Sequence, residues 1–310
     1  AARLAGDLAY DAEMHNRAME FYRVVAQDYQ ASKHFAPAVL GMLWARFDAK
    51  QYQPLLETFQ QYKDALKFEA RAEGYYLAGS AYQDLGNHET AEAMFQAIAT
   101  AAMGTPIEEK VLYKLAASQY ELKKFDKMTE ALDRLRDRFP KSPLNVDAQF
   151  LLALAEARQG QVARGAARLT SIVERGEDHP YYVQALLQRA KLYETAEQLP
   201  AAARDYEAYL LLAKPWGERD LPAPTVQEVC LRLVDILYRL GQYEQTVKMA
   251  RKMRELPDLK PLAMQESLYR EARALVQLKR LQPAIDVLNE LLERYPQNTY
   301  LAEAHYYRGL

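Results

Sequence analysis

The sequence predicts an all-α solenoid of about eight helix-turn-helix units. Two observations carry this prediction: a repeat of about 37 residues and a composition rich in helix formers. The repeat is marked near the start of each second helix by residues that are mostly small. These markers are Ala18, Leu55, Ala91, Met128, Gly165, Ala202, Thr246 and Ala284. A two-helix unit of this length cannot bury its apolar stripe alone, so it must stack on its neighbours.

Composition and charge narrow the classes of function. The 310 residues include only 12 Gly and 14 Pro, and half are hydrophobic, so nearly every segment is a good helix former. A net charge of -2 argues against the broad basic surface of a duplex nucleic-acid binder. No apolar run approaches the roughly 20 residues that a membrane-spanning helix needs. We therefore expect a protein that offers an interaction surface, does not bind nucleic acid and has no membrane-spanning segment.

The repeat divides the chain into one continuous array. Its units are expected at about 1–35, 36–71, 72–107, 108–145, 146–182, 183–221, 222–264 and 265–300, with a partial ninth at 301–310. The sequence starts without an initiator Met and stops within a unit. We therefore expect a fragment of a longer protein.

The unit at 72–107 shows how each element arises. Its first helix has an apolar face at a spacing of three and four residues, formed by Tyr75, Ala78, Gly79 and Tyr82. Gly86 suits the left-handed position at a helix C-terminus. The second helix has an inner face of Ala91, Met94, Phe95 and Ile98. Because Gly79 and Ala91 have almost no side chain, we expect the two helix axes to approach closely.

This spacing of Tyr, Gly, Tyr, Gly, Ala and Phe resembles the tetratricopeptide repeat, and the resemblance covers essentially the whole chain. It implies a right-handed superhelical solenoid whose first helices line a concave surface. Two units resemble the family least. The second has Leu43 and Leu55 at the usually small positions, and the seventh has Val234 and Thr246. We expect these two hairpins to be splayed or shifted in register.

Prolines mark helix ends. Proline is tolerated in the first turn of a helix and costs about 3 kcal/mol inside one. Pro54, Pro200 and Pro283 fall at the start of second helices, whereas Pro140 and Pro296 fall where second helices end. This punctuation supports the repeat independently.

One interval between markers is longer than the rest, because 44 residues separate Ala202 from Thr246. The added residues form a predicted loop at 213–225. Three prolines in it prevent a continuous helix: Pro215, Pro222 and Pro224. Trp216 lies near its tip. Either the loop protrudes and Trp216 contacts a partner, or Trp216 folds back to cap the adjacent hairpin.

The sequence has no constellation typical of catalysis or metal binding. None of the five histidines has a second His or Cys three or four residues away. There is no phosphate-binding loop, dinucleotide fingerprint or nucleophile elbow. Cys230 lies on an apolar helix face, which favours a buried, inert thiol. We expect a protein that is not an enzyme and needs no cofactor or metal ion.

The concave surface is the candidate binding site. The resemblance implies which face of each first helix points inward, and nearly every unit then presents an aromatic ring. These residues are Tyr10, Trp44, Phe47, Tyr76, Tyr113, Tyr120, Phe150, Tyr238 and Tyr269. Such a wall suits a peptide, a partner helix or a saccharide chain. The alternative is that some of these rings belong to the core.

Charged residues on the same face are sorted along the chain. The early part is acidic, with Asp7, Asp11, Asp48, Glu73 and Asp84. The later part is mostly basic, with Arg158, Lys191, Arg239, Arg270 and Arg273. A groove of this kind would orient an elongated partner. The alternative is an ordinary solvated helix surface with pairs four residues apart.

The segment YPQNTYLAEAHYYRG resembles repeats of bacterial envelope proteins such as the outer-membrane assembly lipoprotein and the periplasmic Tol-Pal coordinator. We therefore expect a scaffold of a cell-envelope assembly that holds a protein or peptide in its groove. Its expected location is periplasmic or outer-membrane associated, with the cytoplasm left open. The alternative is the repeat segment of a periplasmic exopolysaccharide export protein that recruits modifying enzymes or contacts the polymer.

Overall fold

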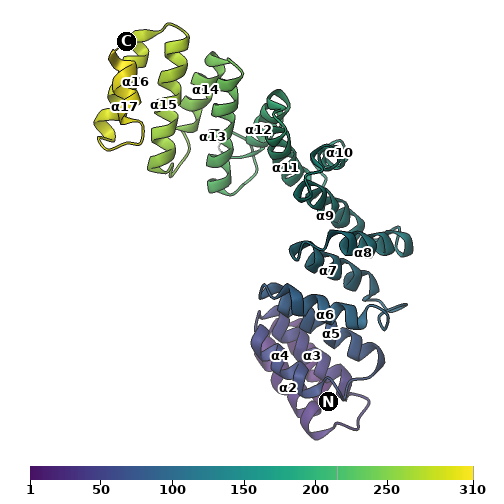
Figure 1. Cartoon of the computed structure of the whole chain (residues 1–310). Coiled ribbons are helices and arrows are strands. Elements are labelled where there is room, and N and C mark those ends of the chain that lie inside the picture. Colours follow the sequence, from purple (N-terminus) through teal and green to yellow (C-terminus); the bar gives the residue numbers. More distant parts are fainter. Residues whose placement is uncertain (215, 310) are drawn as a thin grey trace. The chain divides into compact units, whose positions relative to one another are not determined.

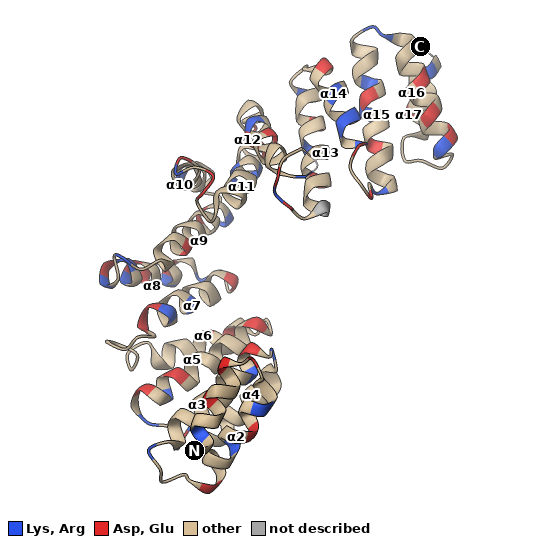
Figure 2. Ribbon diagram, turned by 180° about the vertical axis from the view of Figure 1, so that it is seen from behind, with Lys and Arg blue, Asp and Glu red and all other residues tan. Residues whose placement is uncertain are grey.

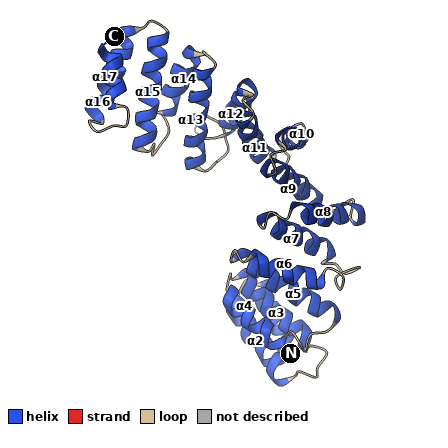
Figure 3. Ribbon diagram, viewed as in Figure 1, coloured by secondary structure: helices blue, strands red, loops and turns tan. Residues whose placement is uncertain are grey.

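The computed structural model describes residues 1–214 and 216–309, and this part of the chain contains helices and no β-strand (Figure 1, Figure 3). The all-α prediction is therefore confirmed. The helices are α1 (Ala2–Asp11), α2 (His15–Asp28), α3 (Phe35–Asp48), α4 (Tyr52–Tyr62), α5 (Phe68–Asp84), α6 (His88–Ile98), α7 (Glu108–Glu121), α8 (Phe125–Arg138), α9 (Leu144–Arg158), α10 (Val162–Val173), α11 (Tyr182–Thr195), α12 (Leu199–Leu212), α13 (Ala223–Arg239), α14 (Tyr243–Met253), α15 (Pro261–Gln277), α16 (Leu281–Arg294) and α17 (Leu301–Gly309). Pro215 of the predicted loop and Leu310 of the predicted ninth unit lie outside the described residues. Among the described helices, none combines the length and apolar character needed to cross a membrane.

Two compact blocks make up the chain, and the division between them falls within α9. The N-block is Ala1–Ala155 and the C-block is Glu156–Leu310. From α1 to α8, and again from α10 to α17, each helix packs against the next one along the chain. Successive first helices also touch, in the series α1, α3, α5 and α7 and in the series α13, α15 and α17. Each block is thus a stack of helix hairpins, which is the packing of a solenoid.

All eight hairpin turns close the first helix in the same way. Five positions before each repeat marker stands a residue with positive φ: Glu13, Lys50, Gly86, Lys123, Gly160, Glu197, Gly241 and Lys279. The following N–H then donates back across the turn, as from Asn87 to the Tyr82 carbonyl at 2.9 Å. This is the Schellman motif, and the left-handed Gly86 is confirmed. Only three of these positions hold Gly, and the other five residues adopt the left-handed conformation at a cost of about 1–2 kcal/mol each.

Glycines let the second helix approach the first. A Cβ added at Gly79 would lie 2.8 Å from the Phe95 ring, and one at Gly6 would lie 2.6 Å from the Tyr22 ring. In both hairpins the ring stands sixteen residues after the glycine. The close approach predicted at Gly79 is therefore confirmed, and its cause is an aromatic ring packed directly on the glycine backbone.

The second and seventh hairpins pack less closely than most others. Contacts between α3 and α4, and between α13 and α14, are fewer than within α1–α2, α5–α6, α7–α8, α11–α12 or α15–α16. Leu43 and Leu55 are both fully buried at the α3–α4 crossing, as are Val234 and Thr246 at the α13–α14 crossing. The left-handed residues Lys50 and Gly241 keep their usual place five positions before the marker. Neither hairpin is therefore shifted in register, and their splaying stays a prediction.

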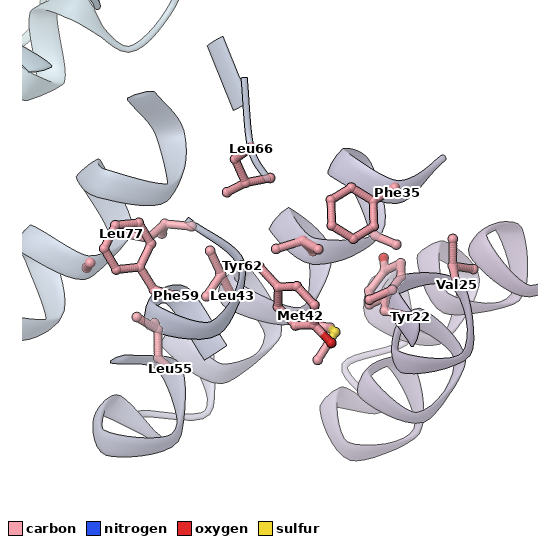
Figure 4. Close-up of a cluster of buried hydrophobic side chains, with 14 of the residues drawn as sticks. Tyr22, Val25, Phe35, Met42, Leu43, Leu55, Phe59, Tyr62, Leu66 and Leu77 are labelled. Carbon is pink, nitrogen blue, oxygen red and sulfur yellow. The ribbon is translucent and has the colours of Figure 1, made fainter. Parts of the chain in front are cut away.

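The core of the N-block is continuous from one hairpin to the next. Figure 4 shows buried side chains from α2, α3, α4 and α5 that meet between the helices. Tyr22, Phe35, Leu43, Phe59 and Leu77 are all at least nine-tenths buried. Because each hairpin contributes to a core shared with its neighbour, no hairpin holds a core of its own.

The inserted segment between α12 and α13 folds back on the C-block. Lys214 and Arg219 are joined by a backbone hydrogen bond of 2.9 Å, and the Arg219 guanidinium donates to the Glu177 carbonyl at 2.9 Å. Trp216 is partly buried against the surrounding core, with the Lys252 ammonium 4.5 Å from its ring centroid. Trp216 thus packs on the C-block while part of its surface stays exposed, and its contact with a partner stays a prediction.

Candidate functional site

Partly exposed aromatic residues recur on the first helices of the N-block. It is formed by Tyr10 on α1, Trp44 and Phe47 on α3, Tyr76 on α5 and Tyr113 on α7, all partly exposed. The rings of Trp44 and Phe47 have centroids 6.2 Å apart, and those of Trp44 and Tyr76 6.5 Å apart. Because α1, α3, α5 and α7 pack in series, the rings lie on adjoining helices. We call these five residues the aromatic surface.

A row of carboxylates accompanies this surface, and each accepts a hydrogen bond from an aromatic side chain of another helix. Tyr10 donates to Asp48, and the Trp44 indole N–H donates to Glu73 Oε1 at 2.6 Å. The Tyr52 hydroxyl donates to Asp84 at 2.8 Å. Burial and then the bond to Asp48 raise the pKa of Tyr10 far above its usual value, so this hydroxyl stays a neutral donor near neutral pH.

A cavity of about 520 Å³ opens between α1 and α3. Its lining is Asp7, Tyr10, Tyr22, Pro37, Leu40, Gly41 and Trp44. The Tyr22 hydroxyl donates to Asp7 at 2.9 Å, and Arg3 pairs with the other oxygen of Asp7 at 2.7 Å. The cavity therefore has apolar walls, two predicted groove rings and one carboxylate that is held in place.

Two of the predicted groove rings lie in the core instead. Tyr120 is 7% exposed and packs beside Phe125, and Tyr269 is 6% exposed and stacks on Tyr300 with centroids 4.1 Å apart. Their helix faces turn toward the second helix or the next hairpin, so neither ring is accessible to a partner in this structure. Phe150 lies partly buried on α9.

Tyr238 belongs to a cluster of rings around one cation in the C-block. The Arg273 guanidinium lies 4.7 Å from the Tyr238 ring centroid, 5.6 Å from that of Tyr269 and 5.9 Å from that of Tyr307. These distances fall in the range of cation–π contacts. These aromatic rings therefore contact a cation of the chain itself.

Three other predicted basic residues of the C-block are engaged by acidic partners. Lys191 pairs with Glu228 at 3.6 Å, Arg270 pairs with Asp235 at 2.9 Å, and Arg239 pairs with Glu197. Arg158 is exposed at the end of α9. By contrast, Asp48, Glu73 and Asp84 form no ion pair within the part of the chain that is described. Figure 2 marks the acidic and basic residues on these helices.

Sequence reasoning missed two tyrosines of the site. Tyr22 and Tyr52 come from second helices, whereas the predicted wall was drawn from first helices alone. The signal for Tyr22 was its place sixteen residues after Gly6, which matches Phe95 after Gly79. Tyr52 follows the left-handed Lys50 closely, so it lies in the first turn of α4 and reaches Asp84 on α5.

Two larger hollows lie beside the loosely packed hairpins. One of about 820 Å³ lies among α12, α13 and α14, and its lining combines leucines such as Leu210 and Leu233 with charged residues such as Glu207 and Lys248. Another of about 830 Å³ lies among α4, α5 and α6, with Leu56, Phe59 and Met94 in its walls. No group of three His, Cys, Asp or Glu residues among 1–214 and 216–309 is placed to hold a metal ion.

Comparison with known families finds tetratricopeptide repeats at residues 72–102, 110–142 and 266–298. The apo form of RapI has a similar fold, with a TM-score of 0.63 and 11% identity over 99% of this chain and 94% of that one. A tetratricopeptide repeat protein from Parabacteroides merdae gives a TM-score of 0.58 and 14% identity over 86% of this chain and 96% of that one.

A Rap protein complexed with competence and sporulation factor gives a TM-score of 0.51 and 14% identity over 99% of this chain and 94% of that one. At such identities these likenesses show the fold alone. A search among curated proteins finds no match to the sequence.

Proposed function

We propose that this chain is a non-catalytic tetratricopeptide scaffold that holds a segment of a protein partner on the aromatic surface of the N-block. The observation that carries the proposal is the accessible series of rings on α1, α3, α5 and α7 beside the cavity of about 520 Å³. Tyr and Trp supply large contact areas at low cost in conformational entropy, and they are enriched where proteins bind.

Two further points support a protein segment as the ligand. A Rap protein of similar fold forms a complex with competence and sporulation factor, so helix-hairpin stacks of this length can carry a binding function. Tyr10 and Trp44 are also anchored by hydrogen bonds to the next hairpin, so these two side chains lose little freedom on binding.

The experiment is selection of binding segments from a displayed peptide library, followed by affinity measurement. The variant Trp44→Ala, Tyr76→Ala, Tyr113→Ala should bind selected segments at least about tenfold more weakly. A matched control is Tyr29→Ala, Phe68→Ala, Tyr306→Ala, which removes three exposed rings elsewhere. Circular dichroism checks that both variants stay folded. Equal affinities for the two variants would contradict the proposal.

We also propose a place in a bacterial cell-envelope assembly, in the periplasm or at the outer membrane. The support is the likeness of YPQNTYLAEAHYYRG to envelope-protein repeats. Fractionation of cells that express the parent protein tests this location, and recovery in the cytosol alone would contradict it. Titration with neutral and anionic oligosaccharides tests the alternative role in exopolysaccharide export, for which Trp44 fluorescence should change on binding.

A further inference from the structure

We propose that the segment held on the aromatic surface is basic, and that the cavity between α1 and α3 receives a Lys or Arg side chain of it. This inference rests on the proposed function and adds the chemistry of the ligand. Its basis is the joint presence of an aromatic-walled cavity and carboxylates whose charge the chain itself leaves uncompensated.

The cavity offers a cation both apolar and electrostatic contacts. Tyr10, Tyr22 and Trp44 contribute to its walls. Asp7 in its lining is already paired with Arg3, so the negative charge available to a ligand beside Tyr10 is that of Asp48. Aromatic rings attract Lys and Arg cations through their quadrupole, most strongly for Trp. Leu40 and Pro37 can cover the aliphatic part of a long basic side chain, since such side chains bury their stems along apolar surface.

The carboxylates along the surface are held in place by neutral groups. Asp48, Glu73 and Asp84 accept hydrogen bonds from Tyr10, Trp44 and Tyr52, which are neutral donors. Neutral donors fix the position of a carboxylate without cancelling its charge. Asp11 adds to the negative field at Tyr10.

Cations of the chain also lie on or beside these helices, and among the described residues none forms an ion pair with Asp48, Glu73 or Asp84. Arg46 on α3 donates to the Pro54 carbonyl and to Thr58 instead. Arg3 is paired with Asp7. Lys114 on α7 is near enough to Asp84 for their charges to interact, although burial lowers the pKa of its ammonium group and no ion pair forms between them in the described structure. The helices α1, α3 and α5 together carry six carboxylates and three arginines. This excess of negative charge favours a basic segment and disfavours an acidic one.

The C-block provides an internal comparison. Its rings at Tyr238 and Tyr269 already contact Arg273, and its basic groups Lys191 and Arg270 already pair with carboxylates. In the C-block, aromatic rings and charged groups therefore already have partners of opposite character within the chain. On the N-block surface the rings and carboxylates are present without the cation.

The test uses the full chain and the peptide segments selected in the experiment above. Each segment is compared with a version in which its Lys or Arg residues are replaced by neutral residues, with citrulline in place of Arg. Affinity is measured at about 50 mM and about 300 mM salt. The charge variant is Asp48→Asn, Glu73→Gln, Asp84→Asn. Its matched control is Asp28→Asn, Asp64→Asn, Glu130→Gln. The control changes the net charge by the same amount, at solvent-exposed residues that are not next to the aromatic surface.

The parent chain should bind the neutral segments at least about tenfold more weakly than the basic ones. The charge variant should bind the basic segments at least about tenfold more weakly than the parent chain does, and the control variant should bind them like the parent chain. Added salt should weaken only the binding of basic segments. If segments depend on the rings but bind the charge variant unchanged, the basic ligand is wrong and the proposed function stands. If no selected segment depends on the rings, both proposals fail.

Discussion

At the scale of single residues, the Tyr22 ring occupies space that two glycines leave open. A Cβ added at Gly6 on α1 would lie 2.6 Å from the ring, and one at Gly41 on α3 would lie 2.5 Å from it. The hydroxyl is tied to Asp7 at 2.9 Å. Because the ring is confined by two helices and held at its tip, it has little freedom to move aside.

Replacing Gly41 by Ala should therefore lower the free energy of unfolding by about 1–3 kcal/mol, the usual effect of overpacking. Urea unfolding followed by circular dichroism measures the change. Gly309→Ala is the control, since a Cβ there would meet nothing within 4 Å. In a chain that already carries Tyr22→Leu, adding Gly41→Ala should lower the free energy of unfolding by less than it does in the parent chain. An unaltered midpoint for Gly41→Ala alone would show that the ring can yield.

Burial decides the chemistry of the one cysteine. Cys230 is fully buried on α13, and burial raises the pKa of its thiol to about 12. The thiolate is the reactive form, so its population near pH 8 falls by about a thousandfold. Ellman's reagent should not label the native protein and should label one thiol per chain in denaturant. Rapid labelling without denaturant would contradict the buried position.

The candidate site was predictable only in part, and the reason lies in single side chains. Repeat register correctly indicated that Trp44, Tyr76 and Tyr113 lie on a partly exposed helix face. It could not separate them from Tyr120 and Tyr269, because a difference of one or two positions around a helix moves a ring from surface to core. The bonds from Tyr10 and Tyr52 to carboxylates depend on packing between hairpins, which the register does not specify.

At the scale of elements, the hairpin turn recurs with one backbone conformation and several residue types. Gly86 has φ +78° with nothing within 4 Å of a Cβ, and Lys123 has φ +58° at the equivalent position. The left-handed conformation costs a non-glycine residue about 1–2 kcal/mol.

Gly86→Ala should therefore destabilise the chain by about 1 kcal/mol, and Lys123→Gly should stabilise it by up to about 1 kcal/mol. Thermal unfolding by circular dichroism compares the two, and the opposite signs act as mutual controls. If both substitutions lower the melting temperature, side-chain contacts of Lys123 outweigh the backbone conformation.

Buried carboxylates join successive hairpins. Glu271 on α15 is fully buried and accepts from Arg251 at 2.6 Å and from Arg254, both at the end of α14. Glu271→Gln should lower the free energy of unfolding by about 3 kcal/mol, because two cations lose their anionic partner. Glu290→Gln breaks an exposed pair with Arg294 and should cost less than about 1 kcal/mol. Similar urea midpoints for both variants would contradict this difference.

At the scale of the whole molecule, the sequence predicted the fold because every hairpin obeys one local rule. The same intervals separate the repeat markers and the left-handed turn residues, so the helix order follows from periodicity alone. The inserted segment has no counterpart in other units. Its course depends on long-range contacts such as Arg219 with Glu177 and Lys252 with Trp216, which no repeat pattern encodes.

Because each helix packs against the next one from α1 to α8 and from α10 to α17, stability should be a sum of local interfaces, and the N-block should fold without the C-block. A fragment of residues 1–161 should be helical by circular dichroism and bind segments selected for the full chain within about threefold of the parent affinity. The fragment 162–310 is the control, expected to be helical without binding them. Binding by 162–310, or loss of binding by a folded 1–161, would place the site outside the N-block.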